Sequence, residues 1–148
     1  MRTVVIGVGN PYRRDDGVGP AVADLLRERG LTVATSLGET TELIELWQGQ
    51  DLAILVDAVR ARPAHPGRVH HLVVADTHSA DIRAASSHGL DLGEAIELAR
   101  VLDRLPKRLA LYAVEVDDVG HGQGLSPPVA TATNHLAEEI YAEVTRCA

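Results

Sequence analysis

Four residues with side chains suited to acid–base or metal chemistry lie near the ends of predicted strands or the starts of predicted helices. Asp15 and Asp16 are adjacent and follow an apolar run that ends at Gly7. Asp57 stands near the end of the most apolar segment, where a buried carboxylate is costly unless it is paired or coordinates something. His88 lies in the loop-like stretch SSHGL, just before a helical pattern. Two carboxylates and one imidazole make a metal site with open positions, suited to zinc, nickel, iron or manganese more than to calcium.

Each of these residues also has a purely structural alternative. Asp15 or Asp16 could be an N-cap or a first-turn carboxylate favoured by the helix dipole. Asp57 could accept hydrogen bonds from loop amides, and His88 could be an ordinary polar loop residue among seven histidines. The metal site is favoured because ligands bind beyond the carboxyl ends of the strands in α/β sheets. Asp16, Asp57 and His88 are all predicted to lie there.

The glycine-containing loop GVGNPY does not match a nucleotide-binding motif. A dinucleotide fingerprint needs a third glycine three residues after Gly9, and that position is Tyr12. The sequence also lacks the Gly-Lys-Ser/Thr of a phosphate loop, and two aspartates at the following helix start would repel a phosphate. The loop therefore predicts a function other than nucleotide binding.

Composition excludes several other classes of function. The chain has 148 residues, which predicts a single domain over residues 1–148. Its net charge of −7 and 3% aromatic content argue against a nucleic-acid partner. The only cysteine, Cys147, is next to the C-terminus, so neither an internal disulfide nor a catalytic thiol is expected. We see no signal peptide and no apolar run near the ~20 residues of a membrane span, and we expect a cytoplasmic protein.

Hydrophobic periodicity predicts strands that alternate with helices, and therefore a three-layer α/β/α domain. The proline-rich stretch RARPAHPG before the fourth strand is too short for a crossover helix, so that strand should run antiparallel. The predicted strands are Thr3–Gly7, Leu31–Ser36, Leu52–Val59, Arg68–Ala75 and Arg108–Val116, and the predicted helices are Pro20–Arg29, Thr40–Gln48 with a threonine N-cap, Leu90–Leu102 and one after the Pro127–Pro128 pair.

Four motifs in this order resemble those of the [NiFe]-hydrogenase maturation proteases. The motifs are GVGNPYRRDDGVGP, LVDAV, SSHGLDLGEAI and GLSPP, and the resemblance runs from Met1 to about Tyr141. It implies a mixed five-stranded sheet with the fourth strand antiparallel, in a phosphorylase/hydrolase-like α/β/α domain. The antiparallel strand expected from the short connection agrees with it.

The resemblance also implies an activity and a site. Members of this family, which are classed as aspartic-type endopeptidases, remove a C-terminal extension from the hydrogenase large-subunit precursor after nickel insertion. Their metal ligands carry over to Asp16, Asp57 and His88, which are the expected catalytic and metal-binding residues. Nickel would be presented by the substrate, and other divalent metals are expected to substitute for it. Asp15 would then orient the loop or hold the helix start, and we expect a monomer.

Further expectations concern the mechanism and the rival functions. No serine sits in a Gly-x-Ser-x-Gly elbow, so hydrolysis should use a water polarised by the metal or activated by a carboxylate. The loop from Asp76 to Gly89 and the stretch GHGQGLSPP should border the metal cleft. A nickel carrier that binds the precursor without cutting it would use the same ligands. A magnesium-binding receiver domain is a second rival, although its lysine would follow the fifth strand and Lys107 precedes it.

Overall fold

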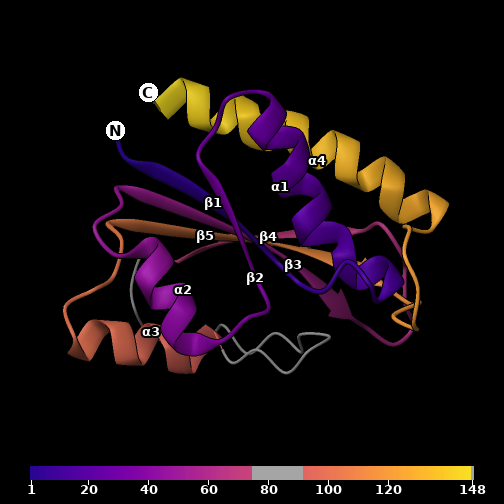
Figure 1. Ribbon diagram of the computed structural model, residues 1–148, viewed down its shortest axis with the longest axis horizontal. Coiled ribbons are helices and arrows are strands. Elements are labelled where there is room, and N and C mark those ends of the chain that lie inside the picture. The colour runs from indigo at the N-terminus through magenta and orange to yellow at the C-terminus, as the bar shows by residue number, and fades with distance from the viewer. Residues whose placement is uncertain (75–91, 148) are drawn as a thin grey trace.

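The computed structural model describes residues 1–74 and 92–147 and contains one five-stranded sheet between two layers of helices (Figure 1). The sheet order is β2-β1-β3-β5-β4. The sheet separates α1 and α4, which lie above it in Figure 1, from α2 and α3, which lie below it. The strands are β1 (Thr3–Val8), β2 (Val33–Ser36), β3 (Leu52–Arg60), β4 (Val69–Val74) and β5 (Arg108–Val116), and the helices are α1 (Val18–Glu28), α2 (Thr40–Trp47), α3 (Leu92–Val101) and α4 (Pro127–Cys147), with a 3₁₀ turn η1 (Arg14–Gly17).

The direction of β4 confirms the prediction made from the connection before it. β4 pairs antiparallel with β5, whereas β1, β2, β3 and β5 are parallel. Only eight residues separate Arg60 from Val69, and they include two prolines and a glycine. A right-handed crossover needs a dozen residues or more, so the chain can only turn back. The mixed sheet is the predicted one.

Alternating side chains of the central strands form two hydrophobic cores. On β3, Ile54 and Val56 pack under α1 and α4, while Ala53 and Leu55 pack under α2 and α3. Because both faces are covered, the strand is an unbroken apolar run from Leu52 to Val56 rather than an alternating one. The helix α4 buries one apolar face at helical spacing, formed by Val129, Ala132, Leu136, Ile140 and Val144.

The starts of several elements differ from the sequence-based expectation, and β2 begins at Val33 rather than Leu31. The predicted threonine N-cap of α2 is wrong, because the cap is Glu39, whose carboxylate accepts hydrogen bonds from the N–H groups of Thr41 and Glu42. These two bonds lower the pKa of Glu39. The helix α1 begins at Val18 rather than Pro20, directly after η1. Among the described residues, no helix is both long and apolar enough to cross a membrane.

A glycine contact fixes α1 against the sheet. A Cβ on Gly19 would lie 2.5 Å from the carbonyl oxygens of both Val8 and Val56, at the ends of the β1–β3 pairing. A Cβ on Gly7 would in turn lie 2.3 Å from the carbonyl oxygen of Gly19. The backbone of α1 therefore touches the backbone of two strands, which leaves no space for a side chain. This contact sets the position of η1, which precedes α1.

Candidate active site

The first candidate residue, Asp16, lies in η1 and is fully buried. Its Oδ2 accepts a hydrogen bond of 2.8 Å from the backbone N–H of Asn10, so the carboxylate holds the loop that leads into η1. The loop passes close by, because a Cβ on Gly9 would lie 2.0 Å from the carbonyl oxygen of Asp16. Gly9 also has φ +142°, a conformation that favours glycine. The GVGN loop thus turns sharply around Asp16.

The second candidate residue, Asp57, lies inside β3, three residues before the strand ends at Arg60, and is 5% exposed. Its position was predicted at the end of the strand. The last β1–β3 pair is Gly7 with Val56, so Asp57 is the first β3 residue past the pairing with β1. On its other side it pairs with Ala113 of β5. The carboxylate Oδ1 accepts a hydrogen bond of 2.8 Å from the N–H of Ala58.

These two aspartates lie at the carboxyl edge of the sheet, at the point where the order of the strands reverses. The helix α1 leads from β1 to β2 on one face, and β3 lies on the other side of β1. In open α/β sheets such a switch point is where ligands bind. The 3₁₀ turn that carries Asp16 contacts β3, the strand that carries Asp57. Carboxylate oxygens are hard donors, so Asp16 and Asp57 are the described residues that could hold a divalent metal at this edge.

The third candidate residue, His88, lies outside the described residues, and so does the loop from Asp76 to Gly89. Within residues 1–74 and 92–147, no group of three or more histidine, cysteine or acidic side chains is arranged to hold a metal ion. The three-residue metal site therefore stays a prediction. The structure describes two of its members, both carboxylates.

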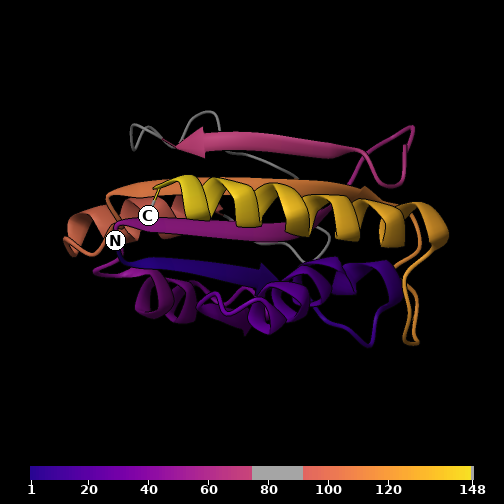
Figure 2. The ribbon, with the colours of Figure 1, turned by 90° about the horizontal axis from the view of Figure 1, so that it is seen from above.

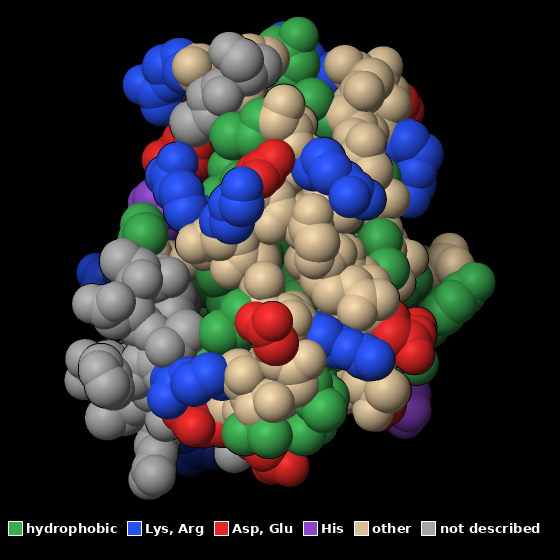
Figure 3. Space-filling view, turned by 90° about the vertical axis from the view of Figure 1, so that its left-hand side faces the viewer, with side chains coloured by type: hydrophobic (Ala, Val, Ile, Leu, Met, Phe, Trp, Pro, Cys, Tyr) green, Lys and Arg blue, Asp and Glu red, His purple; other side chains and the backbone are tan. Residues whose placement is uncertain are grey.

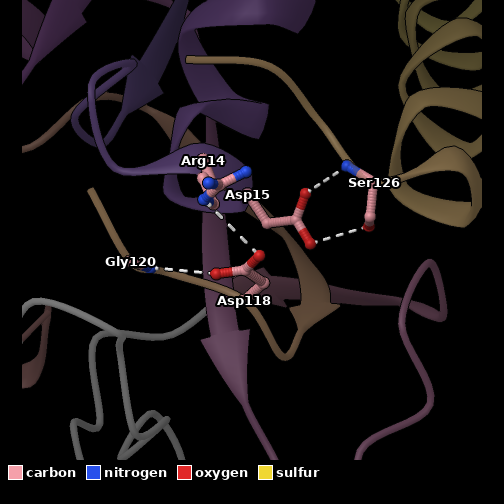
Figure 4. Close-up of polar contacts among 5 residues, drawn as sticks. All are labelled: Arg14, Asp15, Asp118, Gly120 and Ser126. Carbon is pink, nitrogen blue, oxygen red and sulfur yellow. Dashed lines mark hydrogen bonds and ion pairs between the residues drawn. The ribbon is translucent and has the colours of Figure 1, made fainter. Parts of the chain in front are cut away.

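Asp15 has a different role from the helix cap that the sequence allowed. No side chain caps η1. Instead, the carboxylate of Asp15, which is 1% exposed, accepts hydrogen bonds from Ser126 N at 2.7 Å and from Ser126 Oγ at 2.8 Å (Figure 4). Ser126 directly precedes α4 and belongs to the GLSPP motif. Asp15 therefore ties the first loop to a segment more than a hundred residues further along the chain.

Backbone hydrogen bonds strengthen the same connection. Arg14 N donates to the carbonyl of Gly122 at 2.9 Å, and Gly122 N donates to that of Tyr12 at 2.9 Å. Asp15 N donates to the carbonyl of Asp118 at 3.0 Å. Figure 4 also shows the exposed ion pair between Arg14 Nε and Asp118 Oδ2, at 3.6 Å. The loop after β5 is thus a structural support for the turn that carries Asp16. The sequence motif GLSPP was the only signal for it.

We expect the Asp15–Ser126 contact to contribute more to stability than the exposed ion pair beside it. Hydrogen bonds to a buried charge are worth about 1.5–3 kcal/mol, whereas exposed pairs are worth about 0–1 kcal/mol. A double-mutant cycle with Asp15→Ala and Ser126→Ala, measured by urea unfolding, should give a coupling energy in the first range. The matched control is the cycle with Arg14→Ala and Asp118→Ala. Equal coupling in the two cycles would contradict the assignment.

A cleft of about 780 Å³ opens beside the first loop. Gly9 of the first loop and Gly17 of η1 line it, together with residues 35–37 at the end of β2 and residues 123–125 before α4. Its size is that of a small-molecule or short-peptide site. Neither Asp16 nor Asp57 is among its lining residues. The stretch GHGQGLSPP contributes residues 123–125 to this cleft, and its place beside a metal cleft stays a prediction.

A further buried carboxylate, Glu115 of β5, was missed in the sequence. It is 2% exposed and accepts hydrogen bonds from the N–H of His65 at 3.1 Å and, on its Oε2, from His70 Nε2 at 2.7 Å. The hydrogen bond with His70 lowers the pKa of Glu115, and burial opposes that effect. The apolar run LYAVEV with a single acidic residue could have indicated a buried, partnered carboxylate.

Comparison with known proteins identifies the family. The family model described as hydrogenase maturation protease, HycI, matches residues 38–143. The chain belongs to the hydrogenase maturation protease family. Over 147 residues it is 26% identical to the hydrogenase 2 maturation protease of Escherichia coli K12, a match that covers 96% of this chain and 90% of that protein.

Solved structures of hydrogenase maturation proteases share its fold. The hydrogenase maturating endopeptidase HybD from Escherichia coli superposes with a TM-score of 0.79 at 25% identity, covering 99% of this chain and 94% of the other. The [NiFe] hydrogenase maturation protease HybD from Thermococcus kodakarensis has a TM-score of 0.78 at 22% identity, covering 97% and 99%. The resemblance found in the four motifs is confirmed. A receiver domain is excluded by the sheet order. Receiver domains have the order 2-1-3-4-5, whereas the order in this chain is β2-β1-β3-β5-β4.

Proposed function

We propose that this maturation protease removes the C-terminal extension of the nickel-loaded [NiFe]-hydrogenase large-subunit precursor, as a cytoplasmic monomer. The observation that carries the proposal is the placement of Asp16 and Asp57, two buried carboxylates, at the switch point of the sheet in a member of this family. The cleft beside the first loop is large enough for a short peptide segment. Nickel is then part of the substrate, and Asp16, Asp57 and His88 complete its coordination.

The proposed chemistry is hydrolysis without a protein nucleophile. Bound nickel would act as a Lewis acid at the reacting groups. A site carboxylate accepts a proton from the attacking water, whose oxygen bonds to the carbonyl carbon. The C–N bond then breaks, and the leaving amine takes up the proton. Burial keeps bulk water away from the carboxylates, which strengthens their interaction with a cation.

The test is a cleavage assay with the enzyme stripped of metal and with precursor prepared with and without nickel. We expect cleavage of the nickel-loaded precursor only, read as a mass decrease equal to the extension. Binding of the nickel-loaded precursor without cleavage would support the alternative of a nickel carrier or checkpoint protein. Efficient cleavage of nickel-free precursor would contradict nickel recognition while leaving the protease activity established.

A further inference from the structure

The connection between β3 and β4 carries a concentration of positive charge in an acidic protein. The chain has 21 acidic residues against 14 lysines and arginines, yet residues 60–71 contain three arginines, three histidines and no acidic residue. His71 belongs to the opposite face of the sheet, where its ring stacks on Tyr112. The other five residues, here called the basic strip, are all exposed: Arg60, Arg62, His65, Arg68 and His70.

The basic strip lies at the same edge of the sheet as the candidate active site. The connection from β3 to β4 is at the end of the molecule that holds η1 and the loop after β5 (Figure 2). His70 pairs with Ala113, and Ala113 pairs with Asp57, so the three residues form one row on one face of the sheet. A strand spacing of about 4.8 Å puts the Cα atoms of His70 and Asp57 about 10 Å apart, with only the small Ala113 between them.

Glu115 holds part of the strip in place. Its Oε2 contacts His70 Nε2 at 2.7 Å and Arg68 Nε at 3.8 Å. The carboxylate is buried, whereas the side chains of His70 and Arg68 remain 50% and 57% exposed. Glu115 therefore holds the side chains of His70 and Arg68 in position, and their exposed parts remain accessible to a ligand. Arg60 and Arg62 form no ion pair with any residue in the described part of the chain, so the strip keeps a net positive charge.

We propose that the basic strip docks an acidic segment of the hydrogenase precursor beside the active site. The identity of the partner rests on the proposed function. Complementary charge near an active site raises the rate of encounter and fixes the orientation of a partner. At the opposite edge of the sheet, where the parallel strands begin, charged side chains of both signs are dispersed over the surface (Figure 3). The strip is thus a local feature, and the net charge of −7 disfavours a nucleic-acid ligand there.

The test compares two triple variants with the same change in charge. Arg60→Gln, Arg62→Gln and Arg68→Gln together neutralise the strip and leave the His70–Glu115 contact in place. The control combines Arg104→Gln, Arg108→Gln and Arg146→Gln, which are exposed residues near the starts or ends of elements at the opposite edge. Binding of nickel-loaded precursor is measured at about 0.1 M and about 1 M salt, where the Debye length falls from about 10 Å to about 3 Å.

We expect the strip variant to bind the precursor about tenfold more weakly than wild type at the lower salt concentration, with the difference lost at the higher one. The turnover rate at saturating precursor should not change, because no strip residue belongs to the reacting groups. The control variant should match wild type within about twofold. A strip variant with wild-type affinity and wild-type salt dependence would overturn the inference.

A second measurement separates this inference from the proposed function. If wild type does not cleave the precursor, the proposed function is wrong, and a fluorescent hexaglutamate peptide then decides the question of the strip. Tighter binding of the peptide to wild type than to the strip variant supports an acidic-peptide surface. Equal binding to wild type, strip variant and control overturns it.

Discussion

Asp57→Asn is expected to abolish processing of the nickel-loaded precursor and to leave the protein folded. Asparagine has the same shape, and its side-chain oxygen can still accept the hydrogen bond from Ala58 N. What the change removes is the negative charge, and with it the metal ligand or base that the proposed function requires. Loss of such a group lowers rates by about 10²–10⁴-fold. Processing is followed by mass spectrometry, and folding by the thermal unfolding transition.

The same result is expected for Asp16→Asn, whose side chain can likewise keep the contact with Asn10 N. It is also expected for His88→Ala, which tests the ligand outside the described residues. The control is Asp103→Asn, an exposed aspartate with φ +55°, a conformation that asparagine tolerates. Normal processing by Asp16→Asn and Asp57→Asn would show that the two carboxylates have only the structural role given as the alternative, which is to accept hydrogen bonds from the backbone.

Gly19→Ala is expected to destabilise the protein by about 3 kcal/mol, at the upper end of the range for overpacking. A glycine inside a helix is normally less stable than alanine by about 0.5–1 kcal/mol, so the usual effect of this change is a gain. Here the added Cβ would meet two backbone oxygens at 2.5 Å, and backbone atoms of central strands cannot move aside as a flexible side chain can. The measurement is the free energy of unfolding in urea.

The control for this experiment is Gly30→Ala, just after α1. Gly30 has φ +86° and no neighbouring atom within 4 Å of the added Cβ, so only the conformational cost of about 1 kcal/mol applies. The ratio between the two decreases in the free energy of unfolding separates the effect of steric contact from that of backbone conformation. If Gly19→Ala were as stable as wild type, the close approach of α1 to β1 and β3 would not be what positions η1 and Asp16.

Local features of the sequence were sufficient for most of the fold. The boundaries of β5 were predicted without error, because an apolar run stands between a lysine-containing turn and a glycine-rich stretch. The antiparallel direction of β4 followed from the short, proline-rich connection between β3 and β4. Asp57 could be singled out because a carboxylate inside a fully apolar strand needs a partner, whatever the rest of the structure is.

Helix starts were less predictable, because several residues nearby can cap the same turn. Thr40 and Glu39 both have a suitable side-chain oxygen, and their competition is decided by the direction in which the chain enters α2. For α1, the run from Asp15 to Pro20 was compatible with a later start. The tertiary contact of Gly19 with Val8 and Val56 brings the helix start forward to Val18.

By itself, the sequence determined the strand order along the chain, the apolar faces of the helices, the family and the two carboxylates at the sheet edge. Only the tertiary structure decided what holds those carboxylates and what surrounds them. Asp15 meets Ser126 across 111 residues of sequence, and Glu115 meets His70 across 45. Such contacts leave no periodic signal, because each depends on how separate elements stack on one sheet. Propensity and hydrophobic pattern act over a few residues, whereas the partners of a buried charge are set by packing.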